Sequence, residues 1–357
     1  MRGWWWLATL ASVAGCNGPA IDPNDLKDVF TAPSASALSQ SAPLASASAS
    51  APVSASASAS ASASGDVAHE ALPPLVRSPI AEPCAELGGE RAPSDPRAAG
   101  RPACRRARVL EHRDAQGAPR YACVFAPENM AERAPLPLVV FLHDEHDDPT
   151  AISKKTRLRG LSEELDLTGE PRRRGFLLLA PQARRIQGRL RFDTGYRARD
   201  NPDVASIDRF VDELVDERLV DTQQIYAIGA SRGGEMAALY AMLRGDRVAA
   251  FGVFGAAPKE LRWSCPNAPP TPAVAIYRSC DAITPCADVE QWLSLRDRER
   301  ATTHPLRLGA GNSPEPSCAT SSQRCSEKRG TIDHARWPKE RERELLEYLG
   351  RFRLEQH

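Results

Sequence analysis

The segment around Ser231 constrains the fold more than any other part of the chain. A short apolar strand is expected over residues 224–228, and an alanine-rich helical run follows Gly233. Between them the chain reads Gly229-Ala-Ser-Arg-Gly233, a G-x-S-x-G pentapeptide. In such a turn the two glycines allow close backbone contact, and the serine is held at a strained angle with its hydroxyl exposed. The helix that follows offers free backbone N–H groups to a developing oxyanion. The segment therefore predicts a nucleophilic serine. A glycine-rich turn of a nucleotide-binding fold is the alternative.

A serine nucleophile of this type needs a carboxylate and a histidine base, in the chain order serine, acid, histidine. Asp281 comes shortly after a buried strand expected over residues 272–277. Downstream of the serine the histidines are His304, His334 and His357. His304 precedes a strand, which is the wrong end for a site at the carboxyl edge of a sheet, and His357 ends the chain, where order is usually lost. We therefore predict that His334, in a long loop, is the base and that Asp281 orients it.

The remaining pattern alternates strands with helices. A hairpin is expected where residues 108–110 and 121–125 flank a turn, and amphipathic helices are expected near 207–215 and 341–352. Near-continuous apolar runs fit parallel strands covered on both faces: 138–142, 176–180, 224–228, 249–254 and 273–277. The predicted fold class is α/β, with a doubly wound, mostly parallel sheet and an antiparallel N-terminal hairpin. Loops 183–202 and 309–333 are expected to form the walls of the site.

From about residue 108 to residue 352 the chain resembles the α/β-hydrolase superfamily. Within it the resemblance is to secreted polyhydroxybutyrate-depolymerase-like esterases and to feruloyl- and acetyl-xylan-type esterases. The matching segments are Leu138–His143, Leu177–Pro181, Asp203–Asp208, Gly229–Gly234, Asp281–Pro285 and His334–Pro338. The resemblance implies an α/β-hydrolase fold and a serine esterase that works through an acyl-enzyme without a cofactor. It assigns Ser231 as nucleophile, Asp281 as acid and His334 as base.

Two positions depart from the family pattern, and both lie at the predicted oxyanion hole, which would use backbone N–H groups at Arg232 and near Asp144. After His143 such esterases usually continue with glycine, whereas this chain has an acidic run over residues 144–148. A carboxylate there opposes negative charge in the transition state unless its side chain turns away. Arg232 stands where small or amide residues are usual, and its charge would assist the oxyanion or recognise an acidic substrate group. We expect the Asp/Glu/His run over residues 143–148 to form a solvated loop and predict no metal site, with a hard-cation site as the alternative.

The N-terminus has the features of an export signal. Arg2 supplies a positive charge, and an apolar run over residues 4–13 is too short to span a bilayer. The run ends in Val13-Ala-Gly-Cys16, which resembles a bacterial lipobox in which the thiol of Cys16 accepts diacylglycerol. An ordinary secretory signal with a coincidental cysteine is the alternative. Lipidation would tether the chain to a membrane, and Asn17 favours the outer membrane of a bacterial cell envelope over inner-membrane retention.

The segment after Cys16 has low complexity. Residues 32–65 are nearly all Ser, Ala and Pro and show no apolar periodicity, so they cannot form a core. The predicted organisation is a signal peptide over residues 1–15, a lipidated N-terminus and disordered tether over 16–79, and one α/β-hydrolase domain over 80–357.

The cysteines agree with an extracytoplasmic location. The chain has nine, and the eight besides Cys16 are an even number, which in an exported protein predicts disulfides. Eight cysteines allow roughly a hundred pairings, so the connectivity stays open. Cys280–Cys286 and Cys318–Cys325 are expected as local pairs that brace the Asp281 loop and the loop leading to His334.

Charge composition excludes one class of partner. The chain has 46 basic and 46 acidic residues, and its arginine clusters alternate with acidic segments, so we predict no nucleic-acid binding. The expected partners are an ester substrate, either polysaccharide-linked or a polyester, and a membrane through the lipid anchor. Two other functions remain open: a lipid-anchored pseudo-hydrolase that binds polysaccharide or protein, and a serine peptidase of the same fold.

Overall fold

The computed structural model describes residues 75–355, with gaps at 81, 83, 86, 129, 266–267, 310–311 and 319–324. The predicted signal peptide, Cys16 and most of the predicted tether therefore lie outside the described residues. Among those that are described, no helix is both long enough and apolar enough to cross a membrane.

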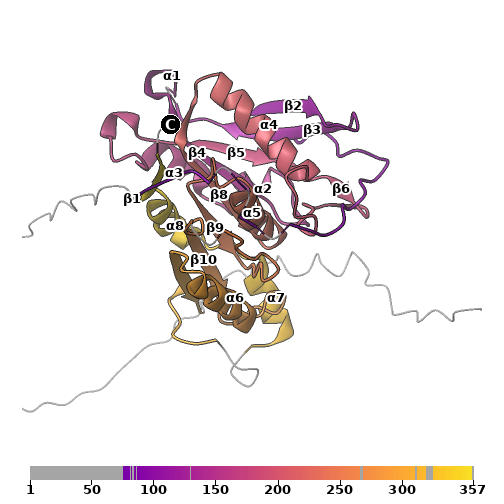
Figure 1. The fold of residues 1–357 in the computed structure, drawn as a ribbon, viewed down its shortest axis with the longest axis vertical. Helices are drawn as coiled ribbons and strands as arrows, with labels where there is room; N and C mark the ends of the chain where they lie inside the picture. Colours follow the sequence, from indigo (N-terminus) through magenta and orange to yellow (C-terminus); the bar gives the residue numbers. More distant parts are fainter. Residues whose placement is uncertain are drawn as a thin grey trace, which may run out of the picture. The chain divides into compact units, whose positions relative to one another are not determined.

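An eight-stranded sheet in the order β11-β10-β9-β8-β4-β5-β3-β2 organises the fold (Figure 1). Its strands are β2 (Arg108–Arg113), β3 (Pro119–Phe125), β4 (Leu136–Leu142), β5 (Leu177–Pro181), β8 (Val220–Ala230), β9 (Ala250–Phe254), β10 (Ala273–Arg278) and β11 (Thr303–Leu308). Every neighbouring pair is parallel except the two that include β3, so β3 alone runs in the opposite direction. This arrangement confirms the predicted α/β-hydrolase fold, including the antiparallel hairpin near the sheet's edge.

Helices cover both faces of the sheet and create two hydrophobic cores. Successive side chains of a strand point to opposite faces, so along β4 Val140 and Leu142 enter one core while Val139 and Phe141 enter the other. The first core receives side chains from α4, α5 and α6, and the second receives them from α2, α3 and α8. The helices are α1 (Met130–Arg133), α2 (Ala151–Lys155), α3 (Leu158–Glu164), α4 (Pro202–Asp216), α5 (Arg232–Leu243), α6 (Cys286–Arg298), α7 (Glu327–Ala335) and α8 (Glu342–Leu349).

The folded domain includes residues that the composition assigned to the tether. Strand β1 (Leu75–Arg77) pairs in parallel with β12 (Phe352–Leu354) outside the main sheet. The side chain of Arg77 donates hydrogen bonds to the backbone carbonyls of Gly245, Val248 and Ala249. Three residues are too few to show a strand pattern in the sequence, and the contacts that hold them are far away along the chain. A second small hairpin pairs β6 (Arg185–Ile186) with β7 (Arg189–Leu190).

All eight cysteines of the domain are paired, but not as expected. The disulfides are Cys84–Cys265, Cys104–Cys123, Cys280–Cys325 and Cys286–Cys318. The predicted local pairs Cys280–Cys286 and Cys318–Cys325 are wrong, because Cys325 is bonded to Cys280, next to Asp281, and Cys318 is bonded to Cys286, at the start of α6. Both cysteines near Asp281 are therefore joined to a segment that is distant in sequence.

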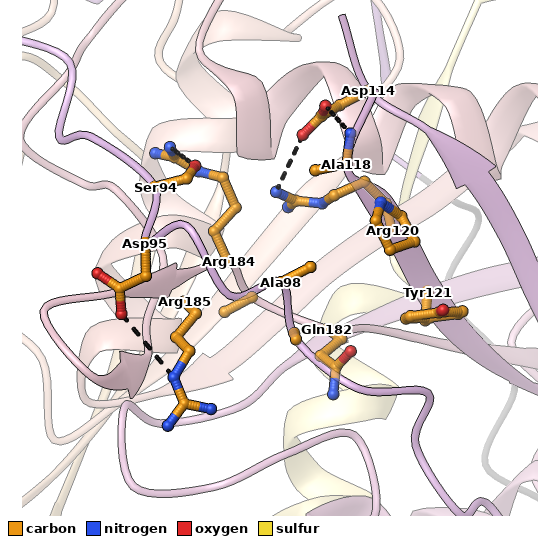
Figure 2. Close-up of a pocket in the computed structure, with 13 residues that line it drawn as sticks. Ser94, Asp95, Ala98, Asp114, Ala118, Arg120, Tyr121, Gln182, Arg184 and Arg185 are labelled. Atoms are coloured by element: carbon orange, nitrogen blue, oxygen red, sulfur yellow. Dashed lines mark hydrogen bonds and ion pairs between the residues drawn. The ribbon is translucent and has the colours of Figure 1, made fainter. Parts of the chain in front are cut away.

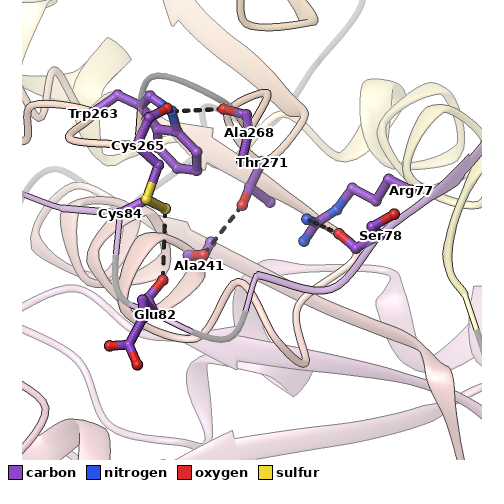
Figure 3. The surroundings of a disulfide bond; sticks show 9 residues. All are labelled: Arg77, Ser78, Glu82, Cys84, Ala241, Trp263, Cys265, Ala268 and Thr271. Carbon is purple, nitrogen blue, oxygen red and sulfur yellow. Dashed lines mark hydrogen bonds between the residues drawn. A yellow bond between two sulfur atoms is a disulfide. The ribbon is translucent and has the colours of Figure 1, made fainter. Parts of the chain in front are cut away.

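The Cys84–Cys265 disulfide attaches the segment before the sheet to the loop after β9 (Figure 3). Beside it, the N–H of Ser264 donates to the carbonyl of Cys84 at 2.9 Å. The indole of Trp263 donates to the carbonyls of Cys265 and Ala268, at 2.7 and 2.9 Å. This end of the domain is thus held by a covalent bond and by hydrogen bonds from a backbone N–H and an indole N–H to backbone carbonyls.

Candidate active site

Ser231 occupies a strained turn between β8 and α5. Its φ is 50° and its ψ is −120°, a conformation that side-chain-bearing residues rarely adopt. Its N–H donates to the carbonyl of Phe254, at the end of β9, at 2.8 Å. A Cβ on Gly229 would lie 2.3 Å from the carbonyl oxygen of Gly233, and one on Gly233 would lie 2.1 Å from that of Leu142. Both glycines are therefore required for the turn to form, as predicted from the pentapeptide.

Asp281 and His334 meet although they are 53 residues apart in sequence. The Nδ1 atom of His334 lies 2.9 and 3.1 Å from the two carboxylate oxygens of Asp281. Both residues are buried, with exposed fractions of 8% for the histidine and 7% for the aspartate. The carboxylate also accepts hydrogen bonds from the backbone N–H groups of Ile283 and Thr284, at 2.9 and 2.8 Å. These contacts fix the carboxylate so that it holds the Nδ1 side of the imidazole ring.

His334 lies in the last turn of α7, not in a long loop as the sequence indicated. Ser326 caps the helix, because its hydroxyl accepts a hydrogen bond from the N–H of Arg329 at 3.3 Å. The sequence does not predict this helix because Gly330, a poor helix former, occupies its middle. A Cβ on Gly330 would lie 2.7 Å from the backbone nitrogen of Ala282, so the glycine allows α7 to press against the Asp281 loop. This close approach brings the base to the acid.

A narrow pocket is lined by both Ser231 and His334. Its volume is about 20 Å³, room for roughly one water molecule. The other lining residues are Phe141, Asp144, Asp147, Ala151, Lys155, Thr156, Ala230, Phe254, Ala335 and Trp337. Among the described residues, none that lines it belongs to the loops 183–202 and 309–333 that were expected to supply the walls, and residues 310–311 and 319–324 of the second loop lie outside the described part. Residues 144–156 and 334–337 line it instead, because the first segment follows β4 and the second follows His334.

The two predicted oxyanion-hole positions have different surroundings. Arg232 is the first residue of α5, where a backbone N–H has no partner within the helix. Its guanidinium is directed to Thr194 and Glu235, both at 2.8 Å. It lines a second pocket beside these residues, not the one that contains Ser231. Asp144 does line the serine pocket, and its carboxylate accepts the N–H of Glu145 at 2.7 Å.

His143, which the resemblance placed before the oxyanion loop, is buried and structural. Its Nε2 accepts a hydrogen bond from the N–H of Ala183 at 3.1 Å, and its Nδ1 lies 2.7 Å from the carbonyl oxygen of Asp144. Because Nε2 accepts, the proton resides on Nδ1 and is donated to that carbonyl. Burial lowers the pKa of His143, which keeps the ring neutral. The neutral ring ties the start of the 144–148 loop to the end of β5.

A polar pocket at the β3 and β5 end of the sheet contains none of the predicted catalytic residues (Figure 2). Its charges are compensated within the protein. Arg120 and Arg184 bind the fully buried carboxylate of Asp203, at 2.6 and 3.3 Å. Burial alone would raise the pKa of Asp203, but the two guanidinium groups outweigh it and hold the pKa below its usual value. This cluster ties the start of α4 to β3 and to the segment that follows β5.

One group in the described part of the chain has the spacing of a metal site, namely Cys286, Glu290 and Cys318. Its two cysteines form a disulfide with each other, so neither offers a thiolate to a metal.

Comparison with known proteins yields distant structural likeness. No family model matches the sequence, and no curated protein matches it. A solved thermostable esterase is 18% identical with a TM-score of 0.47, and the match covers 70% of this chain and 63% of that one. This chain therefore spans less than two thirds of that esterase.

The propionate-bound esterase Est2 of Thermogutta terrifontis is 14% identical with a TM-score of 0.43, and the match covers 59% of this chain and 85% of that one. Esterase 2 of the same organism phosphorylated by paraoxon is 15% identical with a TM-score of 0.43, covering 66% and 93%. Such distant matches do not assign an activity, so the fold assignment depends on the strand order.

Proposed function

We propose that this protein is a serine esterase that hydrolyses carboxylic esters through an acyl-enzyme. The observation that carries the proposal is the contact between His334 and Asp281 beside a pocket that also contains Ser231 in its strained turn. A histidine held by a carboxylate next to a serine at a helix N-terminus is the arrangement that activates a hydroxyl for attack. The structural neighbours are esterases, but their likeness to this chain is too distant to support the proposal.

In the proposed mechanism His334 removes the proton from the Ser231 hydroxyl, whose oxygen attacks the ester carbonyl. The negative charge that forms on the carbonyl oxygen is received by the N–H of Arg232 and by a second N–H near Asp144. His334 then protonates the leaving alcohol. Water activated by the same histidine hydrolyses the acyl-enzyme, and Asp281 stabilises the imidazolium in both halves of the reaction. No cofactor takes part.

The 144–148 loop bears on how well this oxyanion hole works. The carboxylate of Asp144 lines the serine pocket and accepts a hydrogen bond from the backbone N–H of Glu145. The guanidinium of Arg232 is neutralised by Glu235. Arg232 therefore supplies no free positive charge at the serine, so stabilisation of the developing oxyanion depends on backbone N–H groups.

We further propose that the enzyme acts in a bacterial cell envelope, anchored at the outer membrane through a lipid on Cys16. Its substrate would be an ester on a polysaccharide or a polyester within reach of the tether. The motif Val13-Ala-Gly-Cys16 and the low-complexity tether support this, and the four disulfides of the domain suit an oxidising compartment.

One experiment tests both parts. The full chain is expressed in a bacterium with a lipoprotein pathway, and hydrolysis of short-chain aryl esters is measured in membrane and soluble fractions. We expect wild-type activity in the membrane fraction and a loss on the order of 10⁴-fold in Ser231→Ala. Equal rates for wild type and Ser231→Ala would eliminate this serine as nucleophile. A folded wild type that hydrolyses no ester would favour the binder, and cleavage of peptides in preference to esters would favour the peptidase.

In the same fractions the Cys16→Ser variant tests the anchor. Without the thiol no diacylglycerol can be attached, so undiminished activity should move from the membrane fraction to the soluble fraction. Activity that stays in the membrane fraction after this substitution would refute lipid anchoring through Cys16 without affecting the esterase assignment.

A further inference from the structure

Glu342 is an acidic residue with no exposed surface, and it lies in the wall behind the serine pocket. It is the first residue of α8, and its exposed fraction is 0%. Both carboxylate oxygens lie close to the backbone N–H of Arg157, at 3.0 and 2.9 Å. One of them also accepts a hydrogen bond from the indole N–H of Trp337. The carboxylate therefore joins three segments of the chain.

Both partners belong to the walls of the serine pocket. Trp337 lines the pocket and follows His334 by three residues. Its ring packs edge-on against Phe141 and Phe254, with centroids 5.7 Å away in each case. Arg157 directly follows Lys155 and Thr156, which line another part of the same pocket. A single carboxylate thus holds the segment after His334 and the α2–α3 junction.

Helix stability alone does not account for a glutamate here. An acidic side chain in the first turn of a helix interacts favourably with the helix dipole while it is exposed to water. Burying a carboxylate is costly unless its oxygens receive hydrogen bonds. The N–H groups that donate hydrogen bonds to Glu342 belong to residues outside α8. Burial raises the pKa of Glu342 to about 7.

We infer that Glu342 is a positioning residue, which fixes Trp337 and the 155–157 segment as walls of the pocket that contains Ser231 and His334. It does not contact the substrate. The inference depends on the proposed esterase activity only for its kinetic consequence, because the contact with Trp337 can be observed without turnover.

The kinetic test is a double-mutant cycle between Glu342→Leu and Trp337→Phe, which removes the indole N–H and keeps an aromatic ring. At a temperature where every variant is folded, Glu342→Leu should lower kcat/KM for a short aryl ester by about ten- to a hundredfold, the effect of a small displacement in a site. Glu342→Gln keeps one acceptor oxygen and should restore part of the loss. If Glu342 acts through Trp337, the double variant should be no slower than the slower single variant.

The control is Glu347→Leu, the same substitution at an exposed glutamate of α8. It should leave kcat/KM unchanged. A Glu342→Leu enzyme as active as wild type, or losses that multiply in the double variant, would overturn the positioning role while leaving the esterase proposal intact.

A second readout is independent of catalysis. The indole N–H proton of Trp337, identified by its absence from the spectrum of Trp337→Phe, should resonate downfield in wild type and shift upfield in Glu342→Leu but not in Glu347→Leu. If wild type proves inactive on esters, the proposed function fails, and this shift still decides whether Glu342 fixes the pocket wall. An unchanged resonance would overturn the inference.

Discussion

At the scale of single residues, Gly233 shows how little freedom the nucleophile turn has. A Cβ at this position would lie 2.1 Å from the carbonyl oxygen of Leu142 and 2.5 Å from that of His143. Both are backbone atoms at the end of β4 and cannot rotate away. The start of α5, and with it Ser231, is therefore seated directly on the neighbouring strand.

The expected consequence is that Gly233→Ala lowers the free energy of unfolding by about 2–3 kcal/mol, as overpacking in a rigid site does. Urea denaturation measures the change. Gly160→Ala is the matched control, because Gly160 lies in α3 and a Cβ added there would have nothing within 4 Å. There alanine should raise stability by about 0.5–1 kcal/mol, since it is the better helix former. Similar effects of the two substitutions would contradict the tight contact at Gly233.

Which residues of the site could be predicted depends on how local their signal is. Ser231 stands in a motif whose glycines predict the turn. His334 and Asp281 could be predicted from their order in the chain and from the ends of the expected strands. Their catalytic roles remain predictions. Glu342 could not be found, because in the run Arg341-Glu-Arg-Glu344 it looks like any solvated charge. It is buried only because the fold brings it to Trp337 and to the backbone of Arg157.

At the scale of elements, two disulfides cross-link the segments that carry the acid and the base. Cys280 directly precedes Asp281, and its partner Cys325 lies two residues before α7, the helix that carries His334. Nearby, Cys286–Cys318 joins the start of α6 to the segment after β11. The pairing could not be predicted from spacing, because it depends on which segments the sheet brings together.

Removing the first of these bonds should therefore affect activity more than removing a bond elsewhere. We expect Cys280→Ser/Cys325→Ser to lower kcat/KM by about tenfold or more, since small displacements in a site are costly. Cys104→Ser/Cys123→Ser, which opens the disulfide between β3 and the segment before β2, should leave kcat/KM within about twofold although both variants lose stability. Rates are compared at a temperature where circular dichroism shows both variants folded. Equal losses in kcat/KM would indicate that Cys280–Cys325 only stabilises the fold.

At the scale of the whole molecule, the central sheet could be predicted from the sequence, but the pairing of β1 with β12 and the walls of the serine pocket could not. Five apolar runs of the sequence correspond to β4, β5, β8, β9 and β10, because strands covered on both faces are apolar throughout. The alternation with helices then gave the doubly wound arrangement. The contribution of β1 to the domain was missed, since its partner β12 is at the opposite end of the chain. The walls of the serine pocket were missed for the same reason, because they come from contacts between distant segments.

The central claim is that Ser231 is a nucleophile activated by His334, and covalent capture tests it most directly. The purified protein is treated with a fluorophosphonate, and the modified residue is identified by mass spectrometry of its peptides. We predict modification at Ser231 in wild type, a much slower reaction in His334→Ala, and none in Ser231→Ala. Absence of labelling in folded wild type, or labelling that persists unchanged in Ser231→Ala, would contradict the account.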